Sequence, residues 1–257
     1  LLSWLLIGVF SSINVMGNEV PDFSDTVDAE IGAASGLDSL EGSLKLWLDA
    51  DNINGLNNSG LSNGDSISEW KDLSGNNHHA SQTNSNSQPI YKEENGLSFL
   101  EGNSTSITLA LNNPVSYNND DITLFVVTTK SDDNQDYLFG DAGAPASAPS
   151  VISGYNNLDF EFFGSNPRVT LKDNASSGFH ILGVNSASQK AYFDGQIINT
   201  GVNNAFNGKE LDTIFSANPN VAYYDGKIAE FLIFNRQLTD EEVIDVQQYL
   251  STKWGLT

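Results

Sequence analysis

Residues 227–257 read KIAEFLIFNRQLTDEEVIDVQQYLSTKWGLT and carry the clearest structural signals of the chain. The first part, 227–234, is rich in β-branched and aromatic residues, which is typical of a strand. Thr239 and Glu242 then have the spacing of a capping box, which predicts the start of a helix. The apolar residues of this helix recur at helical spacing and are Val243, Val246, Leu250 and Trp254. Gly255 is a typical helix stop, so the chain is predicted to end as one strand followed by one helix.

The rest of the chain, taken outward from this stretch, is predicted to consist of short strands. Residues 122–129 form a β-branched and aromatic run, and 178–185 is a further predicted strand. The predicted strands 190–193 and 196–199 are joined by Asp194-Gly195, a strong hairpin signal. Further predicted strands are 44–49, 66–70, 106–111, 158–163 and 168–171. Many short strands with one terminal helix predict an all-β fold, a sandwich of two antiparallel sheets with one C-terminal helix.

Composition limits the partners that the chain can have. The 257 residues include 33 Asp and Glu against 11 Lys and Arg, which gives a formal net charge of −22. Such a field repels the phosphate backbone of a nucleic acid, so we expect no nucleic-acid partner. Cations, basic proteins and neutral glycans are compatible with it. The chain has no cysteine, which excludes disulfides, thiolate metal sites and cysteine nucleophiles.

The segment before residue 44 differs from the remainder. Residues 1–17 are almost wholly apolar, and residues 18–43 are acidic and rich in small residues, as in a linker or an extended arm. The apolar segment has two interpretations: the remnant of a secretory signal peptide, or a helix or strand buried in the assembly of a filament. Its candidate assembly residues are Trp4, Leu5, Leu6, Val9 and Phe10. The folded domain is predicted to span residues 44–257.

Four segments of this domain resemble one known family. Residues 44–50 (LKLWLDA), 64–76 (GDSISEWKDLSGN) and 191–195 (AYFDG) are similar to motifs of laminin-G-like, concanavalin A-like lectin and glucanase jelly-roll domains in secreted bacterial-type proteins. Residues 225–256 resemble the closing strand and capping helix of the same domains. The resemblance implies a jelly-roll sandwich at an extracellular or cell-surface location. It implies less about function, because this fold carries lectins, adhesion modules, hydrolases and structural subunits.

Calcium is the cofactor that the resemblance implies, since laminin-G-like relatives often bind it at the rim of the sandwich. Calcium prefers oxygen ligands from Asp, Asn and backbone carbonyls in loops. The candidate ligands are Asp49, Asp51, Asp72 and Asn76, near the end of the first strand and in the following turn. The alternative is that these residues only stabilise turns, because Asp and Asn side chains bond their own backbone.

The pattern Asn157-x-Asp159-x-Glu161 resembles the Glu-x-Asp-x-Glu strand of some glycosidases of this fold. Alternate side chains of a strand project from one face, so such a strand places three acidic groups along one sugar. Here Asn157 stands at the position of the nucleophile, and an amide does not form the glycosyl-enzyme ester. The pattern therefore predicts that the chain is not an enzyme. A strand with a polar face toward solvent is the simpler interpretation.

Glycans or surface proteins are the predicted partners of the domain. Aromatic rings in loops stack on the apolar faces of sugars, and carboxylates accept hydrogen bonds from sugar hydroxyls. The candidate ligand-binding residues are Tyr155, Asp159, Glu161, Tyr223 and Tyr224. Trp47 and Trp254 are expected in the core. His180 is expected to be structural, because it lies in an apolar strand and no Gly-x-Ser-x-Gly motif accompanies it.

Together these observations predict a non-catalytic extracellular domain for recognition or adhesion, in which calcium assists the binding of glycans. The alternative is a structural subunit of an extracellular filament or pilus, polymerised through residues 1–17. A glycoside hydrolase is the third hypothesis, and turnover of a polysaccharide would distinguish it from the other two.

Overall fold

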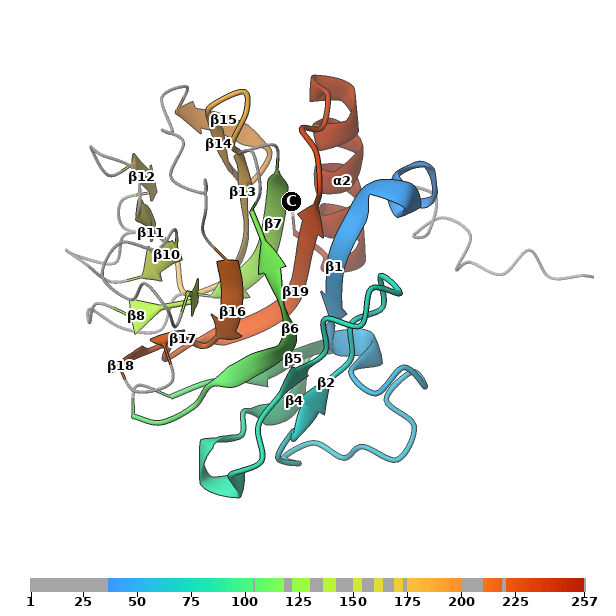
Figure 1. Ribbon diagram of the computed structural model, residues 1–257, viewed down its shortest axis with the longest axis vertical. Coiled ribbons are helices and arrows are strands. Elements are labelled where there is room, and N and C mark those ends of the chain that lie inside the picture. Colours follow the sequence, from blue (N-terminus) through green and yellow to red (C-terminus); the bar gives the residue numbers. More distant parts are fainter. Residues whose placement is uncertain are drawn as a thin grey trace, which may run out of the picture.

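The computed structural model describes residues 37–103, 105–117, 122–129, 136–141, 150–153, 160–163, 169–172, 175–199, 210–218 and 221–256. Short strands make up most of it, and one α-helix follows the last strand (Figure 1). The strands are β1 (Leu44–Asp49), β2 (Glu69–Trp70), β3 (Ala80–Ser81), β4 (Ile90–Glu94), β5 (Leu97–Glu101), β6 (Leu109–Ser116), β7 (Thr123–Thr129), β8 (Asp136–Tyr137), β9 (Phe139–Gly140), β10 (Ser150–Ser153), β11 (Phe160–Phe163), β12 (Val169–Lys172), β13 (Phe179–Asn185), β14 (Lys190–Phe193), β15 (Gln196–Asn199), β16 (Glu210–Ile214), β17 (Ser216–Asn218), β18 (Val221–Tyr223) and β19 (Lys227–Phe234). The helical elements are η1 (Asp38–Ser43), η2 (Ala50–Asn52), η3 (Ser85–Ser87) and α2 (Asp240–Lys253).

The largest sheet has eight strands and forms one layer of the molecule. Its strands follow the order β15-β14-β13-β7-β19-β5-β4, and β1 joins it by pairing with β19. Its ladders are antiparallel. All residues of β7 are buried, and in β19 only Lys227 is partly exposed. These two strands read as almost continuous apolar runs because both of their faces are covered.

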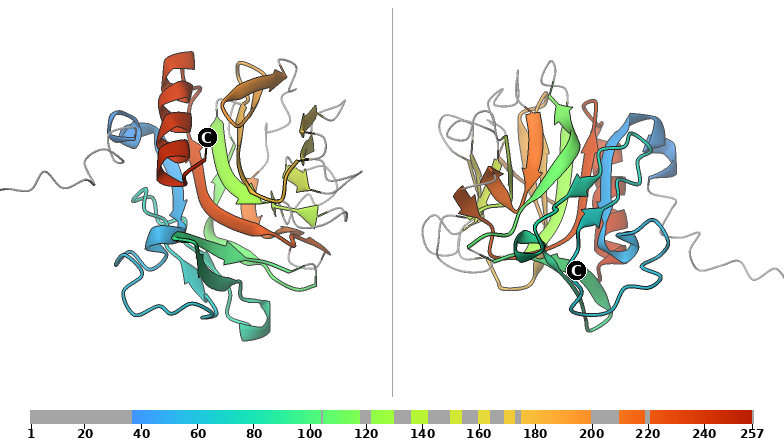
Figure 2. Two further views of the ribbon diagram at one scale, coloured as in Figure 1. Left: turned by 180° about the vertical axis from the view of Figure 1, so that it is seen from behind. Right: turned by 60° about the horizontal axis from the view of Figure 1, so that its bottom comes forward.

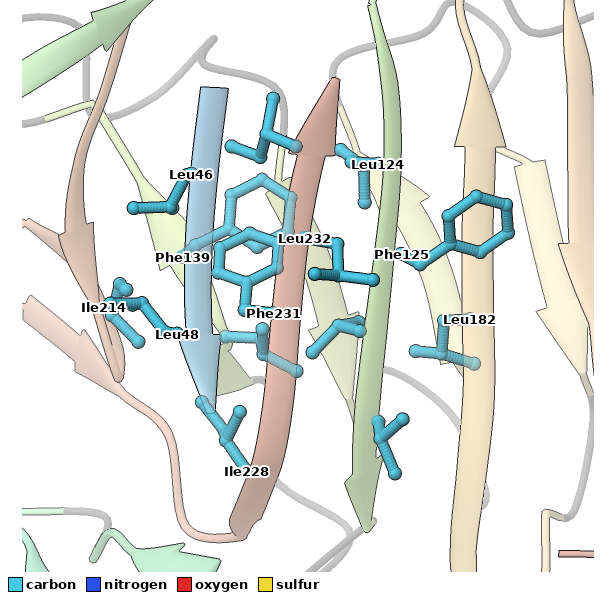
Figure 3. Packing of buried hydrophobic residues seen from close by; sticks show 14 of the residues in the cluster. Leu46, Leu48, Leu124, Phe125, Phe139, Leu182, Ile214, Ile228, Phe231 and Leu232 are labelled. Atoms are coloured by element: carbon cyan, nitrogen blue, oxygen red, sulfur yellow. The ribbon is translucent and has the colours of Figure 1, made fainter. Parts of the chain in front are cut away.

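Smaller antiparallel sheets face the large one. They have the orders β2-β3-β6-β16-β9, β12-β11-β10-β8 and β17-β18. Figure 3 shows buried side chains of β9 and β16, among them Phe139 and Ile214, in one cluster with those of the large sheet. The ring centroids of Phe139 and Phe231 are 5.3 Å apart across the two layers. The predicted antiparallel β-sandwich with one C-terminal helix is therefore confirmed.

The helix α2 lies along the outer face of the large sheet, beside β1 and β19 (Figures 1 and 2). Its predicted capping box is present. The Thr239 hydroxyl accepts the backbone N–H of Glu242 at 3.3 Å, and the Glu242 carboxylate accepts the backbone N–H of Thr239 at 2.9 Å. The apolar stripe predicted from the sequence is buried against the sheet and consists of Val243, Val246, Leu250 and Trp254.

Several predicted strand boundaries match the structure and others differ. The strands at 190–193, 196–199 and 227–234 have the predicted bounds. The strand predicted at 66–70 shortens to β2, because Ser66 forms only an isolated bridge with Ile90. The strand predicted at 106–111 is displaced to β6, which continues through Pro114. The pair β4 and β5 was not predicted.

The first described element lies inside the segment predicted to be a linker. Leu37 and Leu40, at and just before η1, are buried in the core, so packing begins before residue 44. The candidate assembly residues are outside the described residues and are Trp4, Leu5, Leu6, Val9 and Phe10. In the part of the chain that the structure describes, no helix has the length and apolar character needed to span a membrane.

Candidate functional site

Glu230 is a charged residue at the centre of an apolar strand. It is 0% exposed in β19, whose other residues are apolar except Lys227. Asp49 of β1 lies directly opposite Glu230 in the ladder, so the two carboxylates project from the same face of the sheet, toward α2. A buried carboxylate is tolerated only when it is paired and hydrogen-bonded. The residues around Glu230 supply both kinds of contact.

Each oxygen of Glu230 accepts two hydrogen bonds. Trp47 Nε1 and Tyr249 OH donate to Oε1, both at 2.8 Å. Trp254 Nε1 donates to Oε2 at 2.7 Å, and Lys253 Nζ donates to the same oxygen at 3.0 Å. With the opposing carboxylate these side chains form what we name the Glu230 cluster: Trp47, Asp49, Glu230, Tyr249, Lys253 and Trp254.

Lys253 joins the two carboxylates of the cluster. Its Nζ lies 2.6 Å from Asp49 Oδ2 and 3.0 Å from Glu230 Oε2. The other oxygen of Asp49 accepts the backbone N–H of Asp51 at 2.9 Å and thereby caps η2. The ammonium also lies 4.8 Å from the ring centroid of Trp254. The cluster therefore ties β1, β19 and the last turn of α2 together.

The pKa values of the cluster follow from its burial and its charges. Burial raises the pKa of Glu230 to about 7, against the opposing pull of Lys253. Burial alone would lower the pKa of Lys253, but the charges of Glu230 and Asp49 outweigh it and the pKa is raised. Burial and the same carboxylates raise the pKa of Tyr249. Lys253 therefore remains a cation near neutral pH, and Tyr249 remains a hydrogen-bond donor.

A pocket of about 810 Å³ lies against the Glu230 cluster, between η1, β1 and the C-terminal half of α2. The members of the cluster that line it are Trp47, Asp49, Tyr249 and Lys253. Its exposed acidic residues are Asp38, Glu41 and Asp51. The turn Ser74-Gly75 closes one side. Pockets that bind small ligands have volumes of roughly 300–1,000 Å³, so this one is large enough for an oligosaccharide segment.

This pocket has the composition of a site for a polar, uncharged ligand. The part-exposed ring of Trp47 offers apolar surface, and the exposed carboxylates accept hydrogen bonds from hydroxyl groups. Lys253 is the cation among the lining residues, and it is already paired with two carboxylates. The field in the pocket therefore disfavours an anionic ligand. Glu230 has all its acceptor positions engaged and serves as an anchor beneath the pocket.

Only Asp49 of the six cluster residues was predicted as a site residue, although the sequence held a signal for Glu230, Tyr249 and Lys253. Glu230 interrupts an apolar strand, and a charge at such a position needs a partner. Tyr249 and Lys253 are four residues apart on the helix, so they share one face. Trp254 is buried as expected, at 1% exposed, whereas Trp47 is only partly buried and borders the pocket.

Asp72 and Asn76, two of the predicted calcium ligands, hold the turn after β2. Asp72 Oδ1 accepts the backbone N–H groups of Trp47 at 3.0 Å and Ser74 at 2.9 Å. Asn76 Nδ2 donates to the backbone carbonyl of Leu44 at 2.9 Å. These bonds join the turn to β1, which is the turn-stabilising alternative considered from the sequence.

The other two predicted calcium ligands belong to the pocket. Asp49 pairs with Lys253, and Asp51 is exposed beside it. Among the residues that the structure describes, no three or more His, Cys, Asp or Glu side chains gather in a way that could hold a metal ion. Calcium binding stays a prediction.

The predicted glycan-binding residues are not brought together among the described residues. Tyr224 is 0% exposed and its hydroxyl lies 2.9 Å from Thr128 Oγ1, so its ring offers no face to a sugar, which corrects this candidate. Tyr223 ends β18 and is partly buried. Glu161 lies in β11, opposite Ile152 of β10. Outside the described residues lie Tyr155, Asn157 and Asp159.

No protein-family model matches the chain, and no curated protein sequence matches it. Several solved structures share its fold. Domain 4 of an extracellular arabinanase from Geobacillus stearothermophilus, in complex with arabinotriose, has a TM-score of 0.56 at 17% identity, with 80% of this chain and 98% of that chain covered. An arabinofuranosidase complexed with arabinofuranosyl-alpha-1,2-xylobiose has a TM-score of 0.57 at 11% identity, with 78% and 54% covered.

A sialidase of Trypanosoma rangeli has a TM-score of 0.55 at 12% identity, and 82% of this chain matches 33% of that chain. The chain thus spans about a third of the sialidase. At such low identities the likeness shows a shared fold. It supports a β-sandwich of a kind found in carbohydrate-active proteins, and it does not single out the laminin-G-like family.

Two predictions are corrected by these comparisons. The non-catalytic recognition or filament domain is contradicted, because the similar structures are a sialidase, an arabinanase domain and an arabinofuranosidase. The prediction that the chain is not an enzyme is contradicted by the same finding. It rested on Asn157 and its neighbours, a strand pattern that is too short to exclude chemistry elsewhere on the sandwich.

Proposed function

We propose that this chain has a carbohydrate-active function and that the pocket beside the Glu230 cluster binds a neutral glycan segment. The observation that carries the proposal is the pocket itself, in which a part-exposed indole ring and exposed carboxylates line a volume of about 810 Å³. The arabinotriose bound to the similar arabinanase domain supports the choice of a glycan. The motif resemblance supports a concanavalin A-like jelly roll as the class of this sandwich.

The charge of the pocket supports a neutral sugar over a sialylated one. Its acidic lining residues are Asp38, Glu41, Asp49 and Asp51, against the single lysine Lys253. The whole chain adds a formal net charge of −22. An anionic sugar would approach against this field, whereas the hydroxyls of arabinose or xylose would donate to the carboxylates.

The test is calorimetric titration of the full chain with arabinotriose, xylo-oligosaccharides and sialyllactose, with the release of reducing ends measured in the same samples. We expect binding of a neutral oligosaccharide and none of sialyllactose. Trp47→Leu removes the aromatic surface, and we expect it to weaken binding about tenfold or more, which corresponds to about 1.4 kcal/mol. Release of reducing ends that Trp47→Leu lowers in parallel would assign glycoside cleavage to the same pocket.

Because Trp47 also bonds Glu230, a second variant tests the pocket without touching the cluster. Asp38→Asn with Glu41→Gln changes only exposed side chains of η1, and we expect weaker binding with unchanged thermal unfolding. Glu69→Gln is the matched control, an exposed acidic residue of β2 that does not line the pocket. Failure of the wild type to bind any neutral glycan of the panel would overturn the proposal.

A further inference from the structure

A second pocket, of about 630 Å³, lies on the other flank of α2. It forms where the segment before β13 and the turn between β14 and β15 meet the helix and the residues after it. Its apolar lining residues are Phe179, Ile181, Ile244 and Leu256, of which Ile244 is 60% exposed. Three polar residues line one wall of it, with His180 in contact with both of the others: Ser176, His180 and Asp194.

These three residues, which we name the His180 array, are hydrogen-bonded in series. Ser176 Oγ lies 2.9 Å from His180 Nε2, and His180 Nδ1 lies 2.7 Å from Asp194 Oδ2. The backbone N–H of Ile181 donates to Asp194 Oδ1 at 2.8 Å. The carboxylate is thereby held on the Nδ1 side of the imidazole. This favours the tautomer with Nδ1–H, in which Nε2 accepts the proton of the serine hydroxyl.

Two of the three residues are positioned by the hairpin of β13, β14 and β15. Asp194 and Gly195 form its turn with φ values of 44° and 80°, a left-handed conformation that Asp and Gly adopt at low cost. The backbone N–H of Asp194 donates to the Ile181 carbonyl at 2.9 Å, next to His180. The ring of Phe193 packs on the imidazole with centroids 4.8 Å apart. A site built on such elements holds its geometry better than a site built on loops alone.

A separate observation indicates that this pocket accepts a polar ligand. Gln247 of α2 lines it and is 7% exposed, and its side-chain oxygen has no hydrogen-bond partner among the described residues. A buried polar atom without a partner costs about 1–3 kcal/mol. A bound hydroxyl or N–H group that donates a hydrogen bond to Gln247 Oε1 would remove this cost.

The electrostatics of the array suit proton transfer. Burial alone would lower the pKa of His180. The hydrogen bond and charge of Asp194, together with the hydrogen bond to the Ser176 backbone carbonyl, outweigh burial and the nearby Lys172, so the pKa is raised. Ser176, in contrast, is exposed to solvent. An exposed hydroxyl on a buried, carboxylate-oriented base is the arrangement of an activated nucleophile.

We propose that Ser176, His180 and Asp194 form a catalytic triad that hydrolyses a small, uncharged carboxylic ester bound in this pocket. Ser176 is the nucleophile, His180 is the general base and Asp194 orients the imidazole, which are the roles of serine-dependent acyl transfer. The apolar wall takes the acyl group. Gln247 Oε1 accepts a hydrogen bond from a hydroxyl or N–H group of the ester.

The reaction runs in two balanced halves. Ser176 Oγ forms a bond to the carbonyl carbon while its proton moves to His180 Nε2. The C–O bond to the alcohol then breaks, and the alcohol leaves with the proton from Nε2. Water attacks the acyl-serine and gives a proton to Nε2, and the acid leaves as Ser176 Oγ regains that proton. One ester and one water yield one acid and one alcohol.

A structural role for the same histidine makes a different prediction. His180 Nε2 also lies 3.2 Å from the backbone carbonyl oxygen of Ser176. If the imidazole only braces this segment, Nε2–H donates to this carbonyl, the bond survives in Ser176→Ala and little changes. If the hydroxyl is the nucleophile, Ser176→Ala removes all covalent chemistry and leaves the fold intact. This exposed residue therefore separates the two roles.

The experiment treats the full chain with a fluorophosphonate probe and with p-nitrophenyl acetate. We expect the probe to form one adduct, found by peptide mass spectrometry on Ser176, and we expect Ser176→Ala to lower the rate of ester hydrolysis by about 100-fold or more. Ser177→Ala is the matched control, since it changes the adjacent exposed serine and leaves the array unchanged. Thermal unfolding of both variants should equal that of the wild type.

Equal rates of hydrolysis by the wild type and Ser176→Ala, or absence of an adduct on Ser176, would overturn the proposal. Asp194→Asn adds a second measurement. If His180 is the general base, the rate of ester hydrolysis falls and its pH profile shifts with the pKa of His180, whereas a purely structural histidine would leave the pH profile unchanged. Neither variant touches the pocket beside the Glu230 cluster. Neutral-glycan binding should therefore be unchanged in both, and the two proposals succeed or fail separately.

Discussion

The Glu230 cluster and the His180 array lie on opposite flanks of one helix and use their carboxylates differently. Tyr249 and Lys253 extend from α2 to Glu230 on one flank, and Gln247 borders the array on the other. Between these flanks the buried stripe of α2 packs on the large sheet. The same helix thus supports both pockets.

The two carboxylates differ in how fully their acceptor positions are used. Glu230 is 0% exposed, and its two oxygens accept four hydrogen bonds, one of them from an ammonium. The side chain of Asp194 is 40% exposed. It bonds His180, which in turn bonds the exposed hydroxyl of Ser176. A carboxylate with every position engaged anchors structure, whereas a series that ends at a solvent-exposed nucleophile supports chemistry.

The largest expected effect follows from removing the anchor. Glu230→Ala leaves Lys253 beside Asp49 alone and deprives two indole N–H groups and the Tyr249 hydroxyl of their acceptor. Breaking a buried ion pair on one side costs about 3–5 kcal/mol. At a pH above the pKa of Glu230, which is about 7, we therefore expect the free energy of unfolding in urea to fall by that amount. Glu69→Gln, on the exposed side of β2, should change it by less than about 0.5 kcal/mol. A loss below about 1 kcal/mol in Glu230→Ala would refute the anchor.

A smaller effect is expected on the other flank. The pKa of His180 is raised above its ordinary value of 6.5, chiefly by Asp194 acting against burial. The stability that this pair contributes is therefore full below pH 6.5 and is lost as the pH rises through the raised value. We expect Asp194→Asn to lower the pKa of His180 in an NMR titration and to flatten this part of the pH dependence of unfolding.

Asp240→Asn is the control for that titration, because Asp240 pairs with Lys190 at the start of α2 and does not contact the array. An unchanged titration of His180 in Asp194→Asn would show that the carboxylate does not hold the imidazole.

The local signals in the sequence predicted the elements that build this comparison, but not their contacts. The strand at 227–234 and the helix start at Thr239 follow from composition and capping within a few residues, and both are confirmed. Asp49 and Glu230 lie opposite each other only because β1 and β19, which are far apart in the chain, pair in one particular register. No period or spacing within either strand encodes that register.

The same reason explains why the His180 array was missed. The hairpin at Asp194-Gly195 was predicted, and so was the strand that contains His180. Their contact needs the β13–β14 register, in which Leu182 faces Phe193, and also the approach of Ser176 from the segment before β13. A catalytic motif with a fixed spacing along the chain would have been visible in the sequence. The residues of the His180 array come together only in the folded structure.

The smallest effect is expected at the N-terminal end of α2, which borders neither pocket. Arg236 holds the Glu242 carboxylate with Nη1–Oε2 and Nη2–Oε1 distances of 2.7 and 2.8 Å, and the backbone N–H of Thr239 adds a third bond. These bonds, those of Arg236 first, lower the pKa of Glu242 to about 2. Because the folded-state pKa is depressed, the stability from this group is present above its ordinary pKa of 4.5 and is lost as the pH falls through about 2.

We expect Glu242→Gln to reduce stability at pH 7 by about 1 kcal/mol, a value discounted for partial solvent screening, and to reduce the acid-induced loss of stability below pH 4.5. Protonation of the other carboxylates also relieves the repulsion of a chain with a net charge of −22, so only the difference between variant and wild type isolates this group. Glu241→Gln, its exposed neighbour in the same turn, controls for the helix dipole. Because the N-terminal turn lies outside both pockets, Glu242→Gln should leave glycan binding and ester hydrolysis equally unchanged. A selective loss of either activity would mean that the start of α2 positions one flank more than the other.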